Sequence, residues 1–175
     1  NGPEWRIQKK LSAPPFGKTT LFQPEQFHGF AATFRDTVHH RLEILRDYLK
    51  QAPSPTRVEL EPEIKAVMLE MLTNNFFGAE ISYDQIRNKY VPALESVIDH
   101  IVRDTVLNKI GIPLRRLPGI TKRIARAKEA AAEFDELTDI VLRARHDGKG
   151  LWKQFKSDAP DSVLRSNVKV FLAGA

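Results

Sequence analysis

The sequence predicts an all-α protein. Apolar residues recur at steps of three and four through most of the chain, which is the spacing of one helix face. Proline and glycine stand between these periodic stretches, where helices start and stop. The alternation typical of a strand covers only four residues, so we expect at most one short strand, near residues 57–60. A hydrophobic fraction of 42% and a charged fraction of 28% are typical of a globular protein and not of a disordered one.

The first two predicted helices each begin at a proline. Pro3 suits a first turn because its missing N–H would have no helical partner there, and Pro14-Pro15 ends that helix. Pro24 opens a second helix of about 25 residues. Its apolar face is formed by Phe27, Phe30, Phe34, Val38, Leu42, Leu45 and Leu49.

The third and fourth helices are predicted on either side of a glycine. The third spans residues 62–76 and closes at Gly78, a residue suited to a left-handed cap. The fourth spans residues 82–102, and Pro92 within it marks either its true start or a kink.

Two further helices follow a connection. Residues 107–118 contain two prolines and a glycine, which is typical of a loop. A fifth helix is predicted over residues 121–146, and a last one starts at residues 158–160 and is still running at Ala175. No internal repeat or domain boundary is visible.

Composition excludes several kinds of site. The chain has no cysteine, which rules out disulfides, zinc–thiolate sites and any thiolate ligand supplied by this chain. The net charge is +5, but basic residues stand among acidic ones, so we favour a generally basic helical protein and expect no nucleic-acid partner. Adjacent His39 and His40 would point about 100° apart on a helix, and we predict no metal site. The sequence contains no nucleophile triad, phosphate-binding glycine loop or zinc spacing.

Hydropathy leaves the relation to a membrane open. The longest uncharged apolar run begins at Val170 and is far shorter than the roughly 20 residues that a span needs. Because the chain opens on Asn1, an upstream anchor or targeting segment stays an open question. The location is not determined, with a cytoplasmic or cytosol-facing one favoured.

Three segments of the sequence resemble segments of the cytochrome P-450 family. Residues 2–11, followed by Pro15-Phe16, are similar to the family's W-x-x-x-R helix. Phe76-Phe77-Gly78 stands where the family ends helix E. Residues 171–175 are similar to the opening of the A/G-G-x-D/E-T-T/S motif of helix I. Because the three segments stand in the same order as in the family, the whole chain resembles the family's fold from helix C to the first half of helix I.

The resemblance implies a single partial domain over residues 1–175, the distal and helix-rich part of a haem-thiolate monooxygenase. The parent protein would bind haem and hydroxylate an apolar organic substrate, using dioxygen and electrons from an acidic partner of the ferredoxin, flavodoxin or reductase type. The family's E-x-x-R helix and cysteine ligand lie downstream of helix I. Glu43 and Arg46 fit E-x-x-R, but they lie in the second helix, where an exposed ion pair is the better interpretation. We therefore expect the segment alone to be inactive and prone to self-association if it is truly truncated.

The resemblance also assigns roles near the haem. Trp5 and Lys9 share a helix face and would contact a haem propionate, although lysine replaces the usual arginine and loses its two-pronged geometry. The alternative is a tryptophan that anchors a short helix beside a solvated lysine. Ala173 and Gly174 would lie over the haem at the oxygen site, or else serve close helix packing.

Further residues are candidates for substrate and partner contacts. The resemblance makes Val102, Leu107, Ile110, Val170 and Phe171 candidates for the substrate channel, although apolar residues at this spacing are more often core. Arg6 and Lys10 would receive the electron-transfer partner, or else are simply solvated. The alternative for the whole chain is a non-catalytic, all-helical ligand-binding or protein-interaction module. The reading frame beyond residue 175 would separate the two.

Overall fold

The computed structural model describes residues 2–14, 17–106, 121–148, 150, 152 and 160–174. Every regular element in these ranges is a helix, which confirms the all-α prediction. At most one short strand was expected, near residues 57–60, and none forms there: residues 57–59 are irregular, and Leu60 already begins a helix. The described residues contain no other strand to pair with this segment, and a strand without a partner leaves its backbone groups unbonded.

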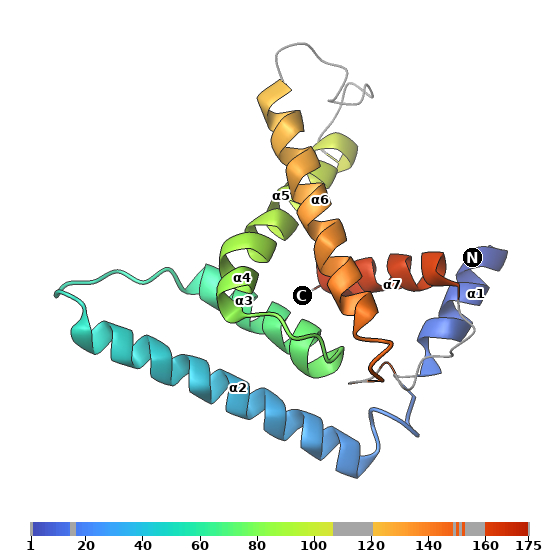
Figure 1. Cartoon of the computed structure of the whole chain (residues 1–175), viewed down its shortest axis with the longest axis horizontal. Coiled ribbons are helices and arrows are strands. Elements are labelled where there is room, and N and C mark those ends of the chain that lie inside the picture. The colour runs from blue at the N-terminus through green and yellow to red at the C-terminus, as the bar shows by residue number, and fades with distance from the viewer. Residues whose placement is uncertain are drawn as a thin grey trace.

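The two predicted N-terminal helices are present. Helix α1 spans Pro3–Ser12 and α2 spans Pro24–Gln51, each with its proline in the first turn. Figure 1 shows α2 running along one edge of the molecule, away from the other long helices.

The third helix is present, with a wider turn at its end. Helix α3 spans Leu60–Glu70 and continues into the π-helical segment η2, Met71–Phe76. Gly78 follows with a φ of 71°, the left-handed conformation that was expected of it.

The fourth helix is a run of alternating α and π turns. Helix α4 (Tyr83–Gln85), η3 (Ile86–Tyr90), α5 (Val91–Ile101) and η4 (Val102–Val106) follow one another without a break. Pro92 is therefore not the start of the helix. The π turn η3 lies directly before it, where the prolyl ring would crowd a regular α-helical turn.

The last two long helices are α6, Thr121–Arg143, and α7, Asp161–Ala173. The prediction that the last helix continues to the end of the chain differs from the structure, in which Gly174 is already in a turn. The Gly174 N–H donates to the Phe171 carbonyl at 3.2 Å, a three-residue bond that tightens the end of the helix.

The core lies where α5, α6 and α7 meet the end of η2. Phe77 is fully buried and its ring centroid lies 5.1 Å from that of Trp152. The Trp152 indole N–H donates to the Val141 carbonyl at 3.0 Å. Gly150 passes against the Phe76–Phe77 backbone, so closely that a Cβ there would meet the Phe77 carbonyl carbon at 2.9 Å. These contacts set the position of residues 150 and 152 against α6 and the end of η2.

Candidate functional site

An apolar groove opens at the C-terminal end of α7. We call it the long groove; it has a volume of about 560 Å³. Its walls come from α3, α5, η4 and the end of α7. Its lining is Lys65, Leu69, Val91, Leu94, Glu95, Ile98, Asp99, Val102, Ala173 and Gly174.

The long groove brings together three residues that the sequence had singled out. Val102 was a substrate-channel candidate, and Ala173 and Gly174 were the oxygen-site candidates. Val102 lies about 70 positions before Ala173 and Gly174 in the chain, yet all three line the same groove. Ala173 and Gly174 present little side-chain volume, so the groove stays open at the end of α7.

The charged rim of the long groove is neutralised by ion pairs. Lys65 Nζ lies 2.6 Å from carboxylate oxygens of both Glu61 and Glu95, and these hydrogen bonds raise the pKa of Lys65. Asp99 accepts hydrogen bonds from Arg103 at 2.6 Å and Arg123 at 2.8 Å, which lower its pKa. Because the charges are already paired, the walls offer a ligand mainly apolar contact.

A second groove lies on the other side of the end of α7, and we call it the short groove. Its volume is about 330 Å³, and it is lined by Phe30, Phe34, Met68, Met71, Leu72, Phe76, Val170, Phe171 and Gly174. Val170 is 71% exposed, whereas Phe171 is partly buried and lies 6.1 Å from the Phe77 ring. Gly174 lines both grooves.

The predicted propionate contacts lie elsewhere. Lys9 Nζ is 4.9 Å from the centre of the Trp5 ring, so the two do share one face of α1. Trp5 is 48% exposed, and Lys9, Arg6 and Lys10 are exposed as well. Helix α1 contacts α7, and Figure 1 places it at the end of α7 far from the C-terminus. A helix of 13 residues is about 20 Å long, so most of that length separates α1 from Ala173 and Gly174.

Two of the substrate-channel candidates, Leu107 and Ile110, lie outside the described residues. Conversely, sequence reasoning did not single out Phe30, Phe34 or Met68 as groove residues. Their helical spacing marked them as apolar faces, and no signal within one helix shows which neighbouring helix leaves a gap.

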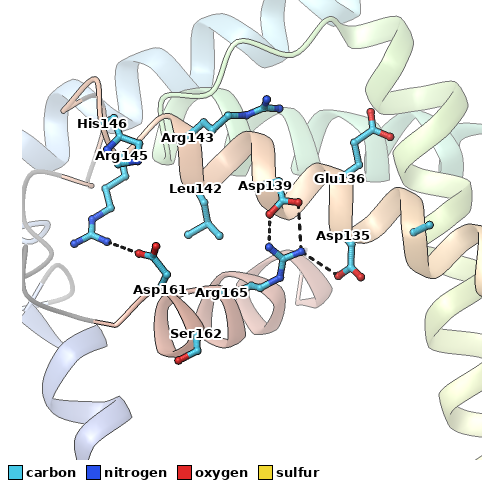
Figure 2. Close-up of a pocket in the computed structure, with 11 residues that line it drawn as sticks. Asp135, Glu136, Asp139, Leu142, Arg143, Arg145, His146, Asp161, Ser162 and Arg165 are labelled. Atoms are coloured by element: carbon cyan, nitrogen blue, oxygen red, sulfur yellow. Dashed lines mark hydrogen bonds and ion pairs between the residues drawn. The ribbon is translucent and has the colours of Figure 1, made fainter.

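A third cavity, of about 790 Å³, lies between α6 and α7, and most of the residues that line it are charged. Figure 2 shows Arg165 of α7 directed toward Asp135 and Asp139 of α6, and Arg145 directed toward Asp161. Arg165 pairs with Asp139 and lies 3.6 Å from Asp135, and Arg145 Nη1 lies 3.3 Å from Asp161. A hydrogen bond from Lys169 lowers the pKa of Asp135. These ion pairs join α7 to α6 and to the turn that follows it.

Within the described ranges, no group of three or more His, Asp or Glu side chains is arranged to hold a metal ion. None of the described helices is long and apolar enough to cross a membrane. The chain matches no model of a protein family, no curated protein and no solved structure.

Proposed function

We propose that the chain is the distal, helix-rich part of a haem-thiolate monooxygenase of the cytochrome P-450 type. Its parent would hydroxylate an apolar organic substrate. The observation that carries the proposal is the long groove, where Val102, Ala173 and Gly174 meet. Each was selected from the sequence for a role at the oxygen or substrate side of such an enzyme.

The long groove would hold the substrate by apolar burial. Its volume of about 560 Å³ is typical of small-molecule sites. Leu69, Leu94 and Ile98 supply carbon surface, and the paired rim charges give no strong preference for an ion. The small Ala173 and Gly174 would let the substrate lie close to the end of α7.

Haem, when bound, would supply the dioxygen chemistry of the parent protein. The carbon-lined end of α7 fits the apolar face of a macrocycle, and Trp5 and Lys9 fit a carboxylate because both can donate hydrogen bonds. The iron ligand would come from outside this chain, which has no cysteine. For one haem to contact both the C-terminal end of α7 and the Trp5–Lys9 face of α1, α1 would have to lie nearer that end of α7 than it does here.

The exposed Arg6 and Lys10 would receive an acidic electron-transfer partner. Reversal of both charges, Arg6→Glu with Lys10→Glu, should slow electron transfer to the parent protein at low salt. The difference should shrink at high salt, because screening removes the steering. An unchanged rate at low salt would exclude this docking site.

The polypeptide encoded by the whole reading frame provides the main test. It should bind haem and give a thiolate-type absorption band with carbon monoxide, whereas residues 1–175 alone should show neither that band nor monooxygenase activity. A Gly174→Leu variant should keep the band and lose the spectral change caused by an apolar substrate, because leucine fills both grooves. Ser166→Leu, an exposed change on α7, is the control. A longer polypeptide without a thiolate-type band contradicts the proposal.

A non-catalytic interaction module is the second candidate, favoured by α2. None of the side chains of this helix is buried, and several of its apolar residues face solvent. Such a surface is typical of contact with another protein. A reading frame that stops directly after Ala175 would favour this candidate over the monooxygenase.

A further inference from the structure

Helix α2 is attached mainly to the continuous helix formed by α3 and η2. Near its start, the Phe30 ring meets the Phe76 ring edge-on, with centroids 5.8 Å apart. In the middle, Asn75 Nδ2 donates a hydrogen bond to Thr37 Oγ1 at 3.0 Å. Both contacts are small, and neither buries a side chain of α2. They align the helix without holding it strongly.

The strongest attachment that the described residues show is an ion pair. Arg41 donates two hydrogen bonds to Glu70, with Nε 2.9 Å from Oε2, and the two side chains are only 20% and 11% exposed. The Arg41 guanidinium also lies 3.8 Å from the centre of the Tyr83 ring. Burial raises the pKa of the Tyr83 hydroxyl, as does its hydrogen bond to Glu63, so the hydroxyl remains a donor. Loss of Arg41 would leave Glu70 as a buried carboxylate without its cation, a costly arrangement.

The docked position of α2 also builds the short groove. Phe30 and Phe34 of α2 form one wall, and the opposite walls come from η2 and α7. Met71, at the floor, is 3% exposed. Movement of α2 away from α3 and η2 would remove the phenylalanine wall and open this floor to solvent.

We propose that α2 is a strap that docks and undocks as a unit, with the Arg41–Glu70 ion pair as its latch. Docking completes the short groove, and undocking dismantles it. The inference is independent of the proposed monooxygenase function, because it rests only on how α2 is held. As such a strap, α2 is a unit of lower stability than the core formed by α5, α6 and α7.

The absence of native cysteine makes a direct test available, because one introduced thiol reports one position. Met71→Cys reports the floor of the short groove, and Leu137→Cys, fully buried on α6, reports the core. Adding Arg41→Gln should speed labelling of the thiol at position 71 by at least about tenfold and that at position 137 by less than about twofold. Arg35→Gln is the matched control: the Arg35 side chain is 67% exposed on the same helix and should change neither rate.

Two outcomes would overturn the proposal. Equal acceleration at both positions would mean that the whole molecule loosens and that α2 is no separate unit. An unchanged rate at position 71 would mean that Arg41 is no latch. If Met71→Cys fails to fold, Leu72→Cys, which lines the same groove, replaces it.

A disulfide lock provides the complementary measurement. Thr37 and Asn75 meet through a hydrogen bond between α2 and η2, which makes Thr37→Cys/Asn75→Cys the pair chosen for a disulfide between the two elements. Loss of free thiols on oxidation would verify that the bond has formed. In the Arg41→Gln background, hydrogen exchange of residues 24–51 should be fast when this pair is reduced and return to the wild-type rate when it is oxidised. Exchange of residues 121–143 should be the same in both states. Oxidation without recovery over residues 24–51 would contradict the strap.

Discussion

Helices α2 and α6 are both long and share an apolar spacing, but they differ in what surrounds them. They have 28 and 23 residues, and both carry apolar residues at helical spacing. Helix α6 buries Phe134, Leu137 and Val141, whereas α2 buries none of its side chains. In Figure 1, α6 passes through the middle of the molecule and α2 follows its edge. An apolar stripe therefore predicts that a helix face is covered, but it does not identify the element that covers it.

The two helices therefore differ in how they are stabilised. Contacts with α5 and α7 hold α6, and close packing makes each missing methylene there costly. Helix α2 depends on its own backbone hydrogen bonds and on the few contacts to α3 and η2 described above. Four experiments test this difference between the two helices.

The largest difference is expected between two leucine truncations. Leu137→Ala, at a fully buried position of α6, should lower the free energy of unfolding by about 3 kcal/mol. Leu42→Ala, at a position of α2 that is 56% exposed, should cost less than about 0.5 kcal/mol. Urea denaturation followed by circular dichroism would measure both. Similar losses would show that α2 is held as firmly as α6.

A smaller loss is expected where the chain after α6 passes the end of η2. Gly150→Ala should cost about 2 kcal/mol, because φ is 55° and the added Cβ meets the Phe77 backbone. Gly148 has a similar φ of 61° but open space around it, so Gly148→Ala should cost only about 1 kcal/mol. Thermal melting of the two variants isolates the contact with Phe77. Equal shifts in melting temperature would mean that this close approach has no energetic effect.

The contact between α6 and α7 should be sensitive to acid. Hydrogen bonding from Lys169 lowers the pKa of Asp135, so its stabilisation is complete above the ordinary aspartate pKa of about 3.9 and is lost as pH falls through the lower folded-state value. Asp135→Asn should reduce stability at pH 7 and flatten the loss of stability below about pH 4. Denaturation at several pH values would show this. An unchanged slope would mean that Asp135 does not couple to folding.

The smallest effect concerns association. The exposed apolar side of α2 should make the chain self-associate, and Leu42→Lys should weaken this association by about fivefold. Sedimentation velocity over a range of concentrations would measure it. Glu129→Lys, an exposed change on α6 that adds positive charge without removing apolar surface, is the control. Equal effects of the two variants would attribute the change to charge alone.

Local sequence signals were sufficient to predict where several of the helices begin and end. The prolines at the starts of α1 and α2 and the glycine after η2 act within one turn, so the sequence predicted these boundaries closely. A strand near residues 57–60 could not be predicted from local signals in the same way, because a strand exists only if another strand pairs with it. The sequence marked Pro92 as a start or a kink, but it did not predict that the helix would accommodate the prolyl ring through the π turn η3.

The sequence by itself determined the all-α class, the apolar faces and the absence of a thiolate from this chain, because each follows from residue type and spacing. The packing of the helices shows that α6 is enclosed by its neighbours, whereas no side chain of α2 is buried. It also decided that Val102 meets Ala173 and Gly174 in one groove while Trp5 and Lys9 lie at the other end of α7. The physical reason is that periodicity describes one helix at a time. A groove is the space that several helices leave between them, and it depends on how they pack.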